Sequence, residues 1–118
     1  MSFSNFTRVG TDHIIWQRGF AFYRDELEAM SHQLEGIANH DSSVEFLQQV
    51  EHFQNQIIVQ RNNIDELKHE VNLYLEQLKQ GPSIASQQEK LHEKYQDFER
   101  VMNLLRHEFA EFLAKSIK

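Results

Sequence analysis

The sequence contains no cysteine, and it has only one proline and four glycines among its 118 residues. The absence of cysteine excludes a disulfide framework, a thiol nucleophile and a thiolate metal site. The scarcity of proline and glycine favours long helices, because these two residues are the strongest breakers of helix interiors. There is also no run of 18 apolar residues, so no segment is predicted to span a membrane.

The chain has no excess of positive charge either, since its formal net charge is −6. Its twelve lysine and arginine residues are scattered, which argues against a surface that follows nucleic-acid phosphates. The opening residues MSFSNFTRVG lack a basic region followed by an apolar run, so no signal peptide is predicted. We therefore expect a cytoplasmic protein with neither a nucleic-acid nor a membrane partner.

Two interruptions divide the chain into three predicted helices. The run Ser42-Ser43-Val44-Glu45 fits a Ser-x-x-Glu capping box, and Gly81-Pro82 is a helix stop followed by a restart. The predicted helices cover residues 11–39, 43–80 and 83–117. Residues 1–10 are predicted to form a flexible or folded-back segment, and residues 1–118 a single domain.

Apolar residues recur at spacings of four and three along each predicted helix. The three resulting seams are Trp16, Phe20, Tyr23, Leu27, Met30, Leu34 and Ile37; Phe46, Val50, Phe53, Ile57, Gln60, Ile64, Leu67, Val71, Tyr74 and Leu78; and Leu91, Tyr95, Phe98, Met102, Leu105, Phe109 and Phe112. A repeat that averages 3.5 residues over this length is typical of a coiled coil. Because both connections are short, we predict an all-α, antiparallel up-down-up bundle of three long helices with coiled-coil-like packing.

Gln60 interrupts the seam of the middle helix. When the chain is folded about its two turns, Gln60 falls opposite Tyr23, while Phe53 falls level with Phe109 and Phe112. A buried amide needs a hydrogen-bond partner. We therefore predict a hydrogen bond between Gln60 and Tyr23 that sets the register, as polar residues do in coiled-coil cores.

A Glu-x-x-His spacing occurs twice and raises the alternative of a metal site. Ferritin-like di-iron bundles use this motif on two helices, and carboxylate and imidazole are suitable ligands for Fe, Mn or Zn. The candidate ligands are His13, Glu66, His69, Glu89 and His92. Helical phase turns Glu66 and His69 away from the seam, so the main prediction has no metal and no cofactor. A hemerythrin-like site is a weaker form of this alternative, because the chain lacks a His-x-x-x-His pair.

Motifs of catalysis are missing from the sequence. It has no glycine-rich phosphate loop, zincin helix or nucleophile elbow. The neighbouring carboxylates Asp25 and Glu26 lie on a predicted helix beside Arg24 and are interpreted as solvated charges. An enzyme is therefore not expected.

Several apolar residues fall outside the seams and suggest an interface. They are Ile15, Phe22, Ile58, Val59, Val101 and Leu104. Phe22, Val59 and Leu104 fall at about one height, so they would form a belt around the middle of the bundle. An exposed apolar patch usually marks an interface. Two alternatives remain: the bundle is wide enough to bury these positions partly, or Phe3 and Phe6 fold back over Ile15 and Phe22.

The resulting prediction is a non-enzymatic interaction or scaffold protein. It would form a homodimer, or bind a protein partner, through the apolar surface at mid-bundle. The first alternative is the metal-binding bundle described above. The second is a small acidic adaptor or chaperone, a role that the sequence neither supports nor excludes.

Overall fold

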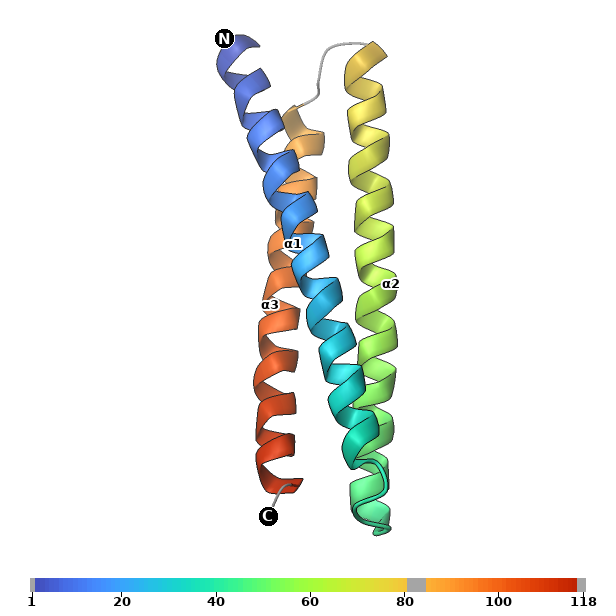
Figure 1. The fold of residues 1–118 in the computed structure, drawn as a ribbon. Coiled ribbons are helices and arrows are strands. Elements are labelled where there is room, and N and C mark those ends of the chain that lie inside the picture. Colours follow the sequence, from blue (N-terminus) through green and yellow to red (C-terminus); the bar gives the residue numbers. More distant parts are fainter. Residues whose placement is uncertain (1, 81–84, 117–118) are drawn as a thin grey trace.

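The computed structural model describes the backbone of residues 2–80 and 85–116 and the side chains of residues 12–79 and 87–116. The chain forms helices α1 (Ser2–Ile37), α2 (Val44–Gln80) and α3 (Ala85–Ser116), with no strand in the described ranges. The three helices lie side by side in one bundle that measures 60 × 19 × 19 Å (Figure 1). Helices α1 and α3 run in one direction and α2 in the other, which confirms the predicted all-α three-helix bundle.

The helix ends differ from the prediction by a few residues, and the start of α1 differs most. Helix α1 begins at Ser2, so residues 2–10 are helical rather than a flexible or folded-back segment. No proline interrupts this stretch, and a single glycine within a helix costs only about 1 kcal/mol. Helix α1 ends at Ile37 rather than at residue 39, and the predicted start of the third helix at residue 83 lies outside the described residues. The predicted Gly81-Pro82 stop and the side chains of Phe3 and Phe6 lie outside the described residues.

Ser43 caps the N-terminus of α2. Its hydroxyl accepts a hydrogen bond from the amide of Phe46 at 3.2 Å, and its carbonyl accepts one from the amide of Leu47 at 3.1 Å. The Asp41 carboxylate accepts a bond from the Ser43 amide at 2.8 Å. The predicted capping box is therefore wrong: Ser43 rather than Ser42 occupies the N-cap position, and the residue three positions on is Phe46 instead of Glu45.

The three predicted seams form the core. Nearly all their residues are buried, including Gln60 at 3% exposure, whereas Phe46, Leu78 and Phe112 are half-buried near the bundle ends. The predicted levels of α2 and α3 are confirmed, because the ring of Phe53 lies 5.2 Å from that of Phe109. Continuous aromatic and aliphatic packing along the axis accounts for the stability of such a slender bundle.

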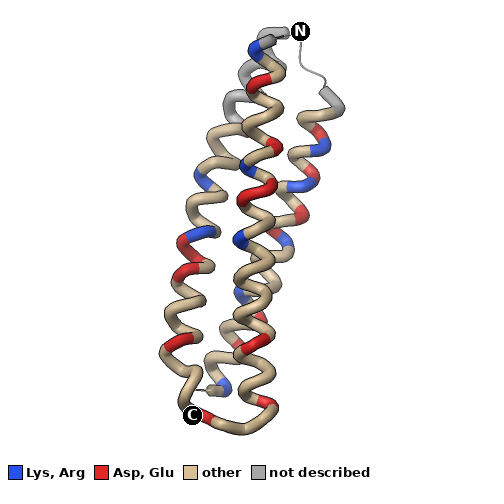
Figure 2. Tube along the Cα trace, turned by 90° about the vertical axis from the view of Figure 1, so that its right-hand side faces the viewer, with Lys and Arg blue, Asp and Glu red and all other residues tan. Residues whose placement is uncertain are grey.

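Charged residues of both signs are distributed along all three helices. Figure 2 shows acidic and basic positions interspersed over the described part of the chain, without a continuous basic stripe. Among the described residues, no helix has a stretch that is long and apolar enough to cross a bilayer.

Candidate functional site

The candidate metal ligands occupy separate environments. Glu66, His69 and Glu89 are exposed on α2 and α3, whereas His13 and His92 are half-buried on α1 and α3. The Nδ1 atoms of these two half-buried histidines are buried without a hydrogen-bond partner. Within residues 12–79 and 87–116, no three histidine or carboxylate side chains gather into a group that could hold a metal ion.

A polar network joins α1 to α3 in place of the predicted Gln60–Tyr23 contact. The Tyr23 hydroxyl donates a hydrogen bond to Glu99 at 3.1 Å, and the Gln60 carbonyl oxygen accepts one from Asn63 at 3.2 Å. The predicted bond between Gln60 and Tyr23 is therefore wrong. Glu99 lies on the neighbouring helix within reach of the phenol, and Asn63 lies one turn along from Gln60.

An ion pair between Glu26 and Arg106 strengthens the same junction. Arg106 donates to both carboxylate oxygens, with Nη2 at 2.8 Å from Oε1. Its Nη1 also donates to Asn103 at 2.8 Å. The Glu26 side chain is only 18% exposed, which corrects the interpretation of this carboxylate as a solvated charge.

Burial, hydrogen bonds and nearby charges raise the pKa values of Tyr23, Tyr95 and Arg106. Burial, followed by the hydrogen bond to Glu99, raises the pKa of Tyr23 to about 12. Burial also raises the pKa of Tyr95, with a contribution from the charge of Glu99. The hydrogen bonds to Glu26 raise the pKa of Arg106. At neutral pH the network therefore consists of protonated phenols and paired ions, which hold the helices together.

The six predicted interface residues are all exposed. Their exposed fractions are 52% for Ile15, 56% for Phe22, 54% for Ile58, 46% for Val59, 43% for Val101 and 60% for Leu104. Exposed apolar residues are common singly, and only a contiguous group indicates an interface.

Three ion pairs identify which side of each helix faces which neighbour. Arg24 pairs with Asp65 between α1 and α2, and Glu26 pairs with Arg106 between α1 and α3. Glu70 pairs with Lys94 between α2 and α3, at 2.6 Å. Residues seven apart on a helix share a side. Each ion pair therefore shows, for both of its helices, which neighbouring helix is faced by the residues spaced seven apart from the paired one.

The six residues are divided among the faces that these pairs define. Ile58 lies seven residues before Asp65, on the side of α2 that faces α1. Ile15 and Phe22 lie on the α3 side of α1, because Phe22 is one turn from Glu26. Val101 lies seven residues after Lys94, on the side of α3 that faces α2. The six residues therefore lie on different faces of the bundle, and their role as an interface stays a prediction.

Val59 and Leu104 join Val101 on the face between α2 and α3. Val59 lies seven residues after His52, and Leu104 seven residues before Glu111. Both His52 and Glu111 line an open groove between α2 and α3. Val59, Val101 and Leu104, half of the predicted set, therefore lie beside the boundary between α2 and α3. We call the surface along this boundary the α2–α3 face.

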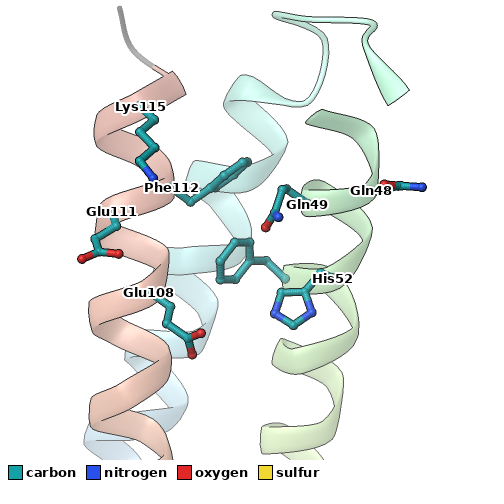
Figure 3. A pocket seen from close by; sticks show the side chains of 8 residues that line it. Gln48, Gln49, His52, Glu108, Glu111, Phe112 and Lys115 are labelled. Atoms are coloured by element: carbon teal, nitrogen blue, oxygen red, sulfur yellow. The ribbon is translucent and has the colours of Figure 1, made fainter. Parts of the chain in front are cut away.

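Two open grooves extend this face toward the ends of the bundle. Figure 3 shows the larger one, about 510 Å³, where Glu108 and Phe112 of α3 project toward Gln49 of α2. Its lining consists of Gln48, Gln49, His52, Phe53, Glu108, Glu111, Phe112 and Lys115. The second groove, about 230 Å³, is lined by Glu70, Leu73, Tyr74, Gln77, Gln87, Lys90, Leu91 and Lys94. The α2–α3 face is therefore a long surface with a groove toward each end and with Val59, Val101 and Leu104 at its centre.

Comparisons of the chain with protein-family models, with curated proteins and with solved structures found no match.

Proposed function

We propose that the chain is a non-enzymatic helical interaction protein, which associates with a second copy or with a protein partner through its α2–α3 face. One observation carries the proposal: Val59, Val101 and Leu104 flank the same boundary and are each at least 43% exposed. The flanking Gln56 and Asn63 supply amides beside this apolar centre. An apolar centre with a hydrogen-bonding rim is typical of protein interfaces.

The polar interior supports an interaction role over a catalytic one. Tyr23, Glu99, Glu26 and Arg106 are engaged with one another across α1 and α3. These bonds make a stiff scaffold, and a stiff scaffold can present its outer faces with little loss of conformational entropy on binding.

The proposal includes the cytoplasmic location expected from the sequence, which fractionation of cells that express the tagged chain would test.

The native size of the tagged chain in a fresh lysate tests this function without assuming a partner. We expect the wild-type chain to elute well above its 14.1 kDa mass. The double variant Val59→Lys, Leu104→Lys should elute as a free chain, because it places two charges at the centre of the interface. Ile58→Lys is the matched control: Ile58 is equally exposed but lies on another side of α2. A wild-type chain that elutes as a monomer would refute the proposal.

A further inference from the structure

We infer that the occupant of the α2–α3 face is an amphipathic helix of a partner protein, with an apolar middle and with lysine or arginine residues toward both of its ends. The inference rests on the proposed function and identifies the chemistry of the partner. It follows from the order of apolar and charged residues along the face, from the exposure of the carboxylates, and from the poor fit of a second copy.

The apolar centre of the face lies at one level of the bundle. The ion pair between Glu70 and Lys94, at 2.6 Å, shows that these two residues are level with each other. Val59 lies eleven residues before Glu70, and Leu104 lies ten residues after Lys94. Because α2 and α3 are antiparallel, both steps lead toward the same end, and Val59 and Leu104 are level to within about 1.5 Å, one residue of helix rise.

Carboxylates lie on both sides of this centre. Toward one end of the bundle, Glu66 and Asp97 lie one heptad, or about 10 Å, from the apolar level. Toward the other end, Glu108 and Glu111 lie four and seven residues beyond Leu104, and both line the larger groove (Figure 3). A partner that covers the apolar centre therefore meets negative charge at both ends of its contact.

These four carboxylates are accessible to a partner, because all four residues are exposed. Glu66 and Glu108 take part in no ion pair within residues 12–79 and 87–116. Asp97 and Glu111 each pair with an exposed residue of their own helix. Exposed pairs of this kind contribute little stability, so a cation of the partner can replace the neighbour.

The lysines of the face lie farther from the apolar centre. Lys94 lies about 15 Å from the apolar level and is already paired with Glu70. Lys90 lies one turn beyond Lys94, and Lys115 lies one turn beyond Glu111. The part of the face within about 10 Å of the apolar level therefore carries net negative charge, which attracts cations of a partner and repels its carboxylates.

A second copy of the chain does not suit this charge pattern. Two copies that meet face to face are related by a twofold axis that lies in the face. An axis parallel to the helices places α2 over α3 of the other copy at the same level, so Glu66 opposes Asp97. An axis across the helices at the apolar level places α3 over α3, so Asp97 opposes Glu111. Both arrangements bring carboxylates together, whereas a basic partner brings opposite charges together.

The spacing of the carboxylates defines the partner helix. Asp97 is eleven residues from Glu108 and fourteen from Glu111, which corresponds to about 16 and 21 Å along α3. Steps of eleven and fourteen residues return to nearly the same side of a helix. A partner helix of about five turns can therefore lay apolar residues over the centre and a lysine or arginine over the carboxylates at each end. This arrangement is the helix-in-groove mode of peptide recognition.

A synthetic helical peptide tests the charge pattern on the purified full-length chain. The lysine probe has about 18 residues, with leucines along one side of its middle and two lysines toward each end, spaced as the carboxylates are. The glutamate probe has the same leucines and a glutamate for each lysine. Isothermal titration calorimetry should give a Kd about tenfold lower for the lysine probe. Added NaCl should reduce this difference, because it screens exposed charges.

Charge reversal on the chain supplies the matched comparison. Glu66→Lys combined with Glu108→Lys should raise the Kd of the lysine probe about tenfold and remove the preference for it over the glutamate probe. Glu28→Lys combined with Glu35→Lys changes the net charge equally, but at exposed positions of α1, and should keep Kd within about twofold of the wild-type value. Circular dichroism of each variant verifies that the bundle is folded.

The outcomes separate this inference from the proposed function. Equal Kd values for the two probes, or equal losses from the two double reversals, overturn the basic partner helix. A purified chain that forms a dimer, and loses it in Val59→Lys, Leu104→Lys, assigns the face to a second copy and overturns the inference. It is also overturned if the chain binds neither probe while its lysate complex depends on Val59 and Leu104. Only a monomer in the lysate overturns the proposed function itself.

Discussion

Gly19 gives the Tyr95 hydroxyl room against α1. A Cβ added at this position would overlap the hydroxyl oxygen and lie 2.8 Å from the Cζ atom of the ring. The ring cannot move aside easily, because it packs against Phe20 at a centroid distance of 5.6 Å and is only 6% exposed. Gly19 therefore serves close helix packing rather than an unusual backbone conformation.

The two described glycines of α1 should respond to alanine with opposite signs. Gly19→Ala should lower the free energy of unfolding by about 1–3 kcal/mol, the usual cost of overpacking a core. Gly36→Ala should raise it by about 0.5–1 kcal/mol, because a Cβ there meets nothing within 4 Å and alanine favours the helix. Urea denaturation measures both values. Stabilisation by Gly19→Ala would contradict the close contact with Tyr95.

Tyr23 should make the bundle sensitive to alkaline pH. Its pKa is raised from 10.0 to about 12 by burial and by the bond to Glu99. Below pH 10 the folded and unfolded chains both hold the proton, so the contribution is constant. Between pH 10 and 12 the unfolded chain loses the proton first, and stability falls by up to about 1.4 kcal/mol per pH unit.

Denaturation at pH 9, 10 and 11 checks this dependence. The free energy of unfolding of the wild type should fall more steeply above pH 10 than that of Tyr23→Phe, which has no proton to lose at this site. Subtracting the two curves removes the contribution of lysine and arginine residues. Parallel curves would show that Tyr23 titrates alike in the folded and unfolded chains.

The burial of individual side chains could be predicted from the spacing of apolar residues, but their hydrogen-bond partners could not. Gln60 and Tyr23 are both in the core as expected, yet each is bonded to another residue. Glu99 and Arg106 lie beside the seam of α3, and that position was the available signal for pairing across helices. Which pairs form depends on how far each side chain reaches, and the spacing does not contain this information.

At the scale of the helices, the interruptions in the sequence predicted three elements and located their ends to within a few residues, except at the start of α1. A continuous apolar seam marks where a helix is packed, and the seam of α1 begins at Trp16. Residues 2–10 are helical ahead of that seam. Periodicity therefore revealed the packed part of the helix and not its full length.

The N-cap of α2 gives a direct test at this scale. Ser43→Ala should lower the free energy of unfolding by about 1 kcal/mol, because it removes the acceptor of the Phe46 amide hydrogen bond. Ser42→Ala should change it by less than about 0.5 kcal/mol, since Ser42 is an exposed residue outside the helix. Equal losses from the two variants would contradict the assignment of the cap to Ser43.

For the whole molecule, the sequence was sufficient for the bundle but not for the arrangement of its faces. Heptad spacing shows which residues point away from the core, and all six predicted interface residues do so. It does not show which neighbour lies on each side of a helix, because three helices can follow one another around the bundle axis either clockwise or anticlockwise. The ion pairs between helices supply this information and separate Ile58 from Val59, although the two are adjacent in the sequence.

The native mass of the tagged full-length chain in a fresh lysate tests the central claim most directly. Size-exclusion chromatography should give more than the 14.1 kDa mass of one chain, and the mass of a free chain for Val59→Lys, Leu104→Lys. Ile58→Lys should keep the mass of the wild type. A wild-type mass of one chain would contradict association through the α2–α3 face. A complex that persists in the double variant would contradict it equally.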